Sequence, residues 1–137
     1  MSEIRGRHDG GRLLVPARVL APHPAADLTG VSGQALIDTG STVTGISPGI
    51  IRRLGLVGRG KRPLGSVHGE GQAERYLFRV GIEATDMSDP AFPFIFEEVI
   101  GFELRDISSF DILLGMDILR RCDLEMRRNG SFRLAFG

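Results

Sequence analysis

Short apolar runs recur along the chain, many of them alternating with polar residues, and turn-forming residues separate them. Alternation with a period of two places one side of a strand in the core and the other in solvent, so this pattern predicts a mostly β protein. We expect strands at residues 12–20, 31–37, 42–46, 92–100 and 112–114. Two hairpins are also expected, over 61–82 and over 124–134, and the second contains the turn signal Asn129-Gly130.

Two segments depart from the strand pattern and predict short helices. In the first, Ser47 can cap the opening turn, Pro48 fits the first helical position and Gly55 ends a stripe of apolar residues at helical spacing. The second helix is expected over 116–121, with Asp117 near its positive end. The overall prediction is therefore a β protein with one or two short helices.

Length and composition fit one globular domain. The chain has 137 residues, of which 42% are hydrophobic, and its 19 glycines suit a protein with many short strands and turns. Residues 1–10 are polar and charged, so we expect a flexible N-terminal tail followed by a single domain over 11–137.

Charge and cysteine usage argue against several classes of function. The formal net charge is zero, so we expect no nucleic-acid partner. The lone Cys122 and the three scattered histidines lack ligand spacing, so we expect no metal, no cofactor and no thiolate nucleophile. No apolar signal core or long apolar run is present, which predicts a soluble domain, either cytoplasmic or excised from a longer membrane-anchored protein.

The strongest chemical signal is Asp38-Thr39-Gly40, which follows directly on the apolar run 35–37. A strand that ends on a carboxylate, followed by a glycine that lets another backbone come close, suits acid–base chemistry. The tripeptide alone is also a common turn, in which Asp accepts hydrogen bonds from the following amides. Two features favour the catalytic interpretation: apolar residues lie on both sides of the turn, and a second apolar run leads into a glycine within 110–119.

Together these two segments resemble the retropepsin-like, or retroviral-type, aspartic proteases. The resemblance extends from about residue 12 to the C-terminus, and the motifs that carry it are Leu36-Ile37-Asp38-Thr39-Gly40-Ser41 and Ile112-Leu113-Leu114-Gly115-Met116-Asp117. It implies the acid protease fold, a single-domain closed β-barrel with a flap hairpin and one or two short helices. It also implies that Leu113, Leu114 and Gly115 lie behind Asp38 and support it.

The resemblance assigns roles to the residues of the turn. Asp38 would be the general acid and base, Thr39 would hydrogen-bond across a two-fold axis, and Gly40 would let two turns approach each other. The hydroxyl of Ser41 could hydrogen-bond the Asp38 carboxylate and favour its ionisation, giving a more acidic working range. The resemblance further implies that chain ends form intermolecular strands, with 132–136 as the candidate segment.

A second carboxylate is needed for this chemistry. In aspartic proteases two adjacent carboxylates share one proton, so that one acts as base toward water while the other protonates the substrate carbonyl. This chain has a single Asp-Thr-Gly, because the sequence that begins at Asp27 has an intervening leucine, whereas Asp111 and Asp117 flank the supporting strand. We therefore predict a two-fold symmetric homodimer in which Asp38 meets its own symmetry mate.

A glycine-punctuated hairpin is the candidate flap. Its expected tip and substrate-binding residues are Gly65, Ser66, Val67, His68, Gly69, Glu70 and Gly71. Glycines allow large backbone rotations at low cost, and closure over bound peptide would exclude water from the carboxylates. The sequence by itself also fits an ordinary exposed hairpin.

Two functions from different classes follow. The first is an aspartic endopeptidase that hydrolyses a peptide or protein substrate as a homodimer. The second is a catalytically silent peptide-binding or dimerisation module with the same fold, which could hold an extended peptide beside the flap strands. The intact Asp38-Thr39-Gly40 favours the enzyme, because a pure binding module has no need to bury a pair of carboxylates.

Overall fold

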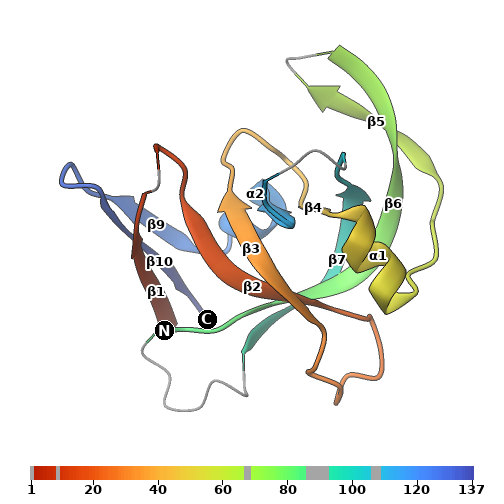
Figure 1. Cartoon of the computed structure of the whole chain (residues 1–137), viewed down its shortest axis with the longest axis horizontal. Coiled ribbons are helices and arrows are strands. Elements are labelled where there is room, and N and C mark those ends of the chain that lie inside the picture. The colour runs from red at the N-terminus through yellow and green to blue at the C-terminus, as the bar shows by residue number, and fades with distance from the viewer. Residues whose placement is uncertain (1, 9, 67–68, 86–92, 106–108) are drawn as a thin grey trace.

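Ten strands and two helices make up the described part of the computed structural model, which covers residues 2–8, 10–66, 69–85, 93–105 and 109–137 (Figure 1). In chain order they are β1 (Ser2–Arg7), β2 (Leu14–Leu20), β3 (Val31–Ile37), β4 (Gly45–Ile46), α1 (Pro48–Leu54), β5 (Lys61–Ser66), β6 (Gly69–Ile82), β7 (Phe94–Glu103), β8 (Ile112–Leu114), α2 (Met116–Leu119), β9 (Asp123–Met126) and β10 (Ser131–Phe136).

Six of these strands close into a barrel. They are hydrogen-bonded in the order β2-β3-β8-β4-β7-β6, and a further pairing between β2 and β6 joins the two ends. Strand β5 pairs with β6 only, so the β5–β6 hairpin extends away from the barrel (Figure 1). The prediction of a mostly β, retropepsin-like closed barrel with a flap hairpin and two short helices is confirmed.

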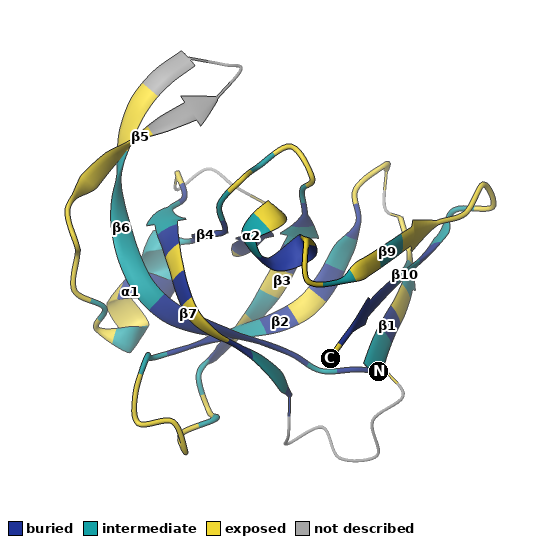
Figure 2. Cartoon of the chain, turned by 180° about the vertical axis from the view of Figure 1, so that it is seen from behind, coloured by how far each residue is buried: buried dark blue, intermediate teal, exposed yellow. Residues whose placement is uncertain are grey.

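The alternating pattern explains how the barrel is filled. Along β6, Phe78, Val80 and Ile82 are fully buried, because every second residue of a strand faces the same side. The ring of Phe78 packs against the backbone of β7 at Gly101, where an added Cβ would lie 2.5 Å from its Cζ atom. In Figure 2 the buried residues, drawn in dark blue, lie on strands of the barrel and on β10.

A second, three-stranded sheet has the order β1-β10-β9. The expectation of a flexible tail is wrong for residues 2–7, because β1 pairs with β10 along its whole length and Ile4 is 3% exposed. Since β1 and β9 occupy the two sides of β10 within one chain, the implied intermolecular pairing of 132–136 is also wrong. The outer strands of this sheet are β1 and β9 instead.

Several local predictions are confirmed. The hydroxyl of Ser47 caps α1 by accepting a hydrogen bond from the amide of Ile50, and Gly55 ends the helix with φ of 63°. The Asn129-Gly130 turn joins β9 to β10, with Gly130 at φ of 93°. Helix α2 is shorter than expected.

The predicted strand at 42–46 is reduced to Gly45–Ile46, because the carbonyls of Ser41 and Thr42 accept hydrogen bonds from the start of α2. Strand β7 begins and ends later in the chain than the predicted 92–100. No helix in the described ranges is long and apolar enough to cross a membrane.

Candidate active site

Asp38 lies directly beyond the end of β3, at the same end of the barrel from which the flap hairpin rises (Figure 1). Strand β3 runs parallel to β8, and Ile37 is the partner of Leu114. The amide of Asp38 extends this pairing by one step, donating to the carbonyl of Leu114 at 3.0 Å. The backbone that carries the carboxylate is therefore fixed by the neighbouring strand, while the half-buried side chain remains accessible.

The turn itself uses the carboxylate as an acceptor. The amide of Gly40 donates to Asp38 Oδ1 at 2.8 Å, and the amide of Ser41 donates to the Asp38 carbonyl at 3.3 Å. A Cβ on Gly40 would lie 3.1 Å from Oδ1, which is a tight contact. Thr39 and Gly40 are exposed, so the tip of the turn is open to another molecule.

The structure brings the predicted supporting residues to the expected place. Leu113 and Leu114 are buried in β8 beside β3, and Leu114 has no exposed surface. Gly115 follows, and a Cβ there would lie 2.6–2.9 Å from the backbone C, O and N atoms of Val43. The residue behind the turn must therefore be small.

Ser41 differs from its expected role. Its hydroxyl donates to the carbonyl of Val43 at 2.7 Å, within the segment that follows the turn. This bond stabilises the backbone after Asp38. It uses the hydroxyl hydrogen that was expected to bind the Asp38 carboxylate.

Most of the predicted flap residues lie in the β5–β6 hairpin. Gly65 and Ser66 end β5, and they pair with Glu70 and Gly69 at the start of β6, while Gly71 pairs with Leu64. Val67 and His68 lie outside the described residues. The hairpin is therefore established up to its last backbone pair, on the side of the barrel where Asp38 lies.

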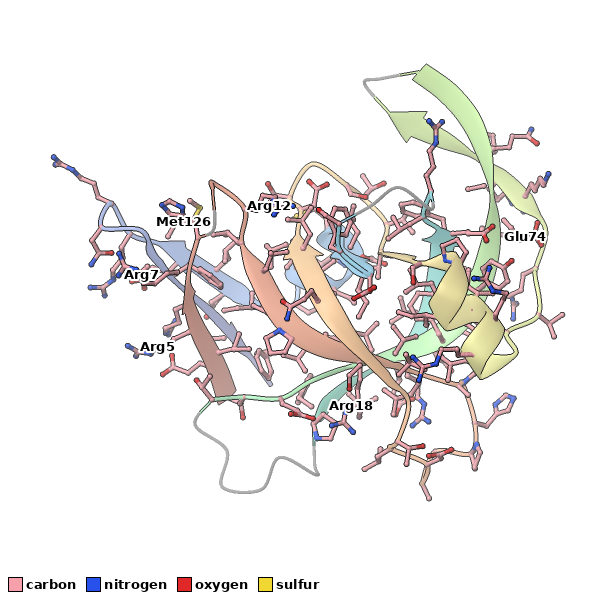
Figure 3. The ribbon with its side chains drawn as sticks, in the orientation of Figure 1. Arg5, Arg7, Arg12, Arg18, Glu74 and Met126 are labelled. Carbon is pink, nitrogen blue, oxygen red and sulfur yellow. The ribbon has the colours of Figure 1, made fainter. Side chains whose placement is uncertain are left out.

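The base of the hairpin carries an anchor that the sequence analysis missed. Glu74 on β6 accepts a hydrogen bond from the amide of Gly60 at 3.0 Å, and its carboxylate packs against Gly58 (Figure 3). The Arg59 amide also donates to the carbonyl of Arg75 at 2.8 Å. The connection between α1 and β5 is thus attached to the flap strand just before the hairpin leaves the barrel.

Two acids near the site also have functions that sequence reasoning did not find. Asp111 Oδ2 accepts from the amide of Gln34 at 3.1 Å, and Asp117 accepts from both the amide and the hydroxyl of the fully buried Thr44. An available signal was their position at the two ends of the run that contains β8. Their backbone partners lie more than 70 residues away in sequence and could not be inferred from it.

Cys122 is a half-buried thiol whose surroundings disfavour the thiolate. Burial raises the pKa of the Cys122 thiol to about 11, so the nucleophilic thiolate is scarce near neutral pH. In the ranges that the structure describes, no group of three or more His, Cys, Asp or Glu side chains is arranged to hold a metal ion.

Comparison with known proteins identifies the class. Residues 25–118 match the family described as "Aspartyl protease", and because this is more than half of the chain, the protein belongs to that family. Its fold is that of the retropepsin-like members, as the sequence resemblance implied.

One curated protein is also similar in sequence. The chain is 28% identical over 116 residues to the Arabidopsis thaliana protein DNA-DAMAGE INDUCIBLE 1, covering 82% of this chain but only 26% of that relative. It thus spans about a quarter of the length of the curated relative that it matches.

Two solved structures are also similar. A retropepsin-like aspartic protease from Rickettsia conorii matches with a TM-score of 0.66 at 21% identity, covering 98% of this chain and 90% of that one. The retroviral protease-like domain of Ddi1 from Leishmania major matches with a TM-score of 0.47 at 21% identity, covering 86% and 82%. The first of these supports the fold.

Proposed function

We propose that the protein is an aspartic endopeptidase that works as a homodimer, with water activated between two Asp38 carboxylates. The observation that carries the proposal is the placement of Asp38 in an aspartyl protease fold: its backbone is fixed by β8, its carboxylate is half-buried, and the adjoining Thr39 and Gly40 are exposed. This arrangement leaves room for a second turn to approach.

The second carboxylate comes from the partner because the nearby acids of the same chain are engaged elsewhere. Asp111 and Asp117 each accept hydrogen bonds from the backbone of a neighbouring segment. Asp27 accepts from the amide and the hydroxyl of Thr29 in the loop before β3. A two-fold axis beside Asp38 brings two identical carboxylates together, and such an axis produces a symmetric dimer contact.

In the proposed reaction, the ionised Asp38 of one protomer takes a proton from water. The water oxygen attacks the scissile carbonyl carbon, while the protonated Asp38 of the partner subunit gives its proton to the carbonyl oxygen. In the second step the Asp38 that took the proton from water gives it to the amide nitrogen, while the partner subunit's Asp38 takes a proton from a hydroxyl of the tetrahedral intermediate. The C–N bond then breaks and releases a carboxylic acid and an amine. Each carboxylate gains one proton and loses one proton per turnover, so the pair returns to its starting state, and no metal or covalent intermediate takes part.

Other residues of the turn and the flap assist. Thr39 is exposed at the tip, where its hydroxyl would hydrogen-bond across the axis, and Gly40 would let the two turns approach. The β5–β6 hairpin would close over an extended peptide and exclude water from the carboxylates.

Cleavage of an unstructured protein at acid pH tests the proposal. Wild-type protein is expected to cleave it, and Asp38→Asn is expected to abolish cleavage because both members of the carboxylate pair are replaced by amides that cannot ionise. Asp27→Asn is the matched control, since it changes another acid of a Thr-Gly-containing turn and is expected to retain full activity. Specific activity should also fall when the protein is diluted below the dimer dissociation constant.

The binding module remains a second candidate because β5 is the outermost strand of its sheet, so an extended peptide could pair with its free side. A wild-type dimer that binds an unstructured peptide but never cleaves it would support this alternative. Cleavage that persists in Asp38→Asn would contradict the assignment of Asp38.

A further inference from the structure

The segment that follows the Asp38 turn, residues 41–44, is attached to the start of α2, and at its end the carbonyl of Thr44 accepts from the amide of Phe102 on β7 at 3.1 Å. We call it the post-turn segment. The amide of Met116 donates to the carbonyl of Ser41 at 2.7 Å, and the amide of Asp117 donates to the carbonyl of Thr42 at 3.2 Å. Figures 1 and 2 show α2 next to the loop that leads from β3 to β4.

The carboxylate of Asp117 completes this attachment. Oδ2 accepts a hydrogen bond from the amide of Thr44 at 3.1 Å, and Oδ1 accepts one from the Thr44 hydroxyl at 2.7 Å. Oδ1 also accepts from the amide of Ile118 at 2.9 Å, which satisfies a donor in the first turn of α2. One carboxylate therefore joins the end of the post-turn segment to the beginning of the helix.

Thr44 also binds Gly115, the glycine behind the turn. It is fully buried, and its hydroxyl oxygen accepts a hydrogen bond from the amide of Gly115 at 3.2 Å. Both donors of the buried Thr44 therefore point at Asp117, which is itself partly exposed. A carboxyl group has two oxygens that can accept, so Asp117 can satisfy both donors of this buried residue at once.

We infer that Asp117 is a positioning residue for Asp38: through Thr44 it holds the post-turn segment against the junction of β8 and α2, and so fixes the turn that carries the catalytic carboxylate. The inference rests on the proposed function. Asp38 is fixed on one side by Leu114, and the chain after it returns to Asp117, three residues beyond Leu114. Both attachments of the turn therefore lie within one short stretch of chain.

Loss of the Asp117 carboxylate has a defined consequence. The amide and hydroxyl of Thr44 would lose their acceptors while remaining buried, so the post-turn segment would move toward other partners or toward water. Two carboxylates that share a proton must meet closely, and a misplacement of roughly 1 Å can cost about 100-fold in rate. Asp117 would act through Asp38 and not through substrate contact, so the change is expected in kcat rather than in KM.

Four variants and a matched control test this. Asp117→Asn keeps one acceptor oxygen, and Asp117→Ala keeps none. Thr44→Ser keeps the hydroxyl, whereas Thr44→Val removes it at nearly constant volume. The control is Asp123→Asn, which changes an exposed acid on β9. It is expected to leave activity unchanged.

For the wild type and variants, kcat and KM are measured per folded dimer, with the dimer fraction taken from sedimentation. We expect kcat to fall roughly 10- to 100-fold in Asp117→Ala. We expect smaller losses in Asp117→Asn and Thr44→Val, near-normal kcat in Thr44→Ser, and KM within about twofold throughout. An unchanged kcat per folded dimer in Asp117→Ala would overturn the inference. If Asp117→Ala does not fold, Asp117→Asn and Thr44→Val decide in the same way.

Amide hydrogen exchange gives a readout that does not need activity. Positioning by Asp117 predicts that the Asp117 and Thr44→Val variants exchange at least ~10-fold faster in residues 38–44 while the barrel strands keep wild-type rates. Wild-type protein that cleaves nothing would contradict the proposed function. The amide exchange rates of residues 38–44 would then be the test of whether Asp117 holds the post-turn segment. Unchanged exchange in 38–44 would overturn the inference in either case.

Discussion

Gly115→Ala is the substitution whose effect on the site follows most directly from the structure. An added Cβ would lie 2.6 Å from the backbone carbon of Val43, whereas ordinary contacts begin at 3.4 Å, so the two backbones must separate by about 0.8 Å. The neighbours of the Cβ are backbone atoms, which cannot turn aside as a flexible side chain can. The backbone conformation is not the obstacle, because Gly115 has φ of −91° and ψ of −176°, an extended geometry that alanine also adopts.

Two costs follow from this separation. Overpacking of a buried site typically costs about 2 kcal/mol, which for a domain of this size lowers Tm by roughly 8 °C. A displacement near 0.8 Å of the segment after Asp38 should also reduce kcat by roughly 30- to 100-fold, if the carboxylates work as a proton-sharing pair. The activity loss is thus expected to exceed what a fall in the folded fraction at 25 °C could cause.

Denaturant unfolding and steady-state cleavage at 25 °C measure both effects. Gly49→Ala is the matched control, because Gly49 lies in α1 with nothing within 4 Å of an added Cβ. Alanine has a higher helix propensity than glycine, so Gly49→Ala should raise the free energy of unfolding by up to about 1 kcal/mol and keep its activity. A Gly115→Ala protein with wild-type stability and wild-type kcat would refute the steric argument and the support role of Gly115.

Other predictions concern stability, reactivity and the flap. Arg79 is 1% exposed and donates to four backbone carbonyls of residues 21–27. Arg79→Met should therefore lower the free energy of unfolding, measured with denaturant, by about 3 kcal/mol. A loss below about 1 kcal/mol would contradict this. Since burial raises the pKa of Cys122 to about 11, alkylation of the folded protein at pH 8 should be about 100-fold slower than in denaturant, as followed by mass spectrometry. Equal rates would mean that the thiol is accessible and ionised. A hydrogen bond from Arg127 lowers the pKa of Glu125 below its ordinary value of 4.5, so the wild type should be more stable than Glu125→Gln at pH 7. This difference in stability should vanish as the pH falls through the lowered pKa of Glu125. A constant difference from pH 7 to pH 2 would argue against the ion pair. Glu74→Ala removes the side-chain part of the attachment between the α1–β5 connection and β6. It should raise KM several-fold with little change in stability, whereas an unchanged KM would exclude the Glu74 side chain from flap control.

The sequence predicted those parts of the structure that short segments encode. A capping serine, a proline and a terminal glycine specify α1, and Asn129-Gly130 specifies the β9–β10 hairpin, because each of these signals acts within a few residues. The chemical signal at Asp38 could be found for the same reason. The motif combines a strand, an acid and a glycine in one continuous run.

The features that could not be predicted depend on partners far along the chain. Residues 2–7 read as a polar tail because the strand that orders them, β10, lies at the other end of the sequence. Ile4 was the one apolar side chain to bury there, which is too little for a periodic pattern. The segment before β4 looked like a strand, but the carbonyls of Ser41 and Thr42 and the amide of Thr44 bind the start of α2.

The three acids near β8 illustrate how structure separates roles that sequence leaves open. Asp111 binds the backbone of Gln34 on β3 just before β8 begins, through Oδ2 and through its own amide at 3.0 Å. Asp117 binds Thr44 just after β8 ends. Each of these carboxylates accepts hydrogen bonds from a distant segment and cannot move toward a substrate without breaking them. Asp38 lies between these two attachments, and its carboxylate accepts from the amide of Gly40, two residues further on in the same turn. The two outer acids therefore hold distant segments on either side of β8, which leaves Asp38 as the acid of the three that the proposed mechanism can use.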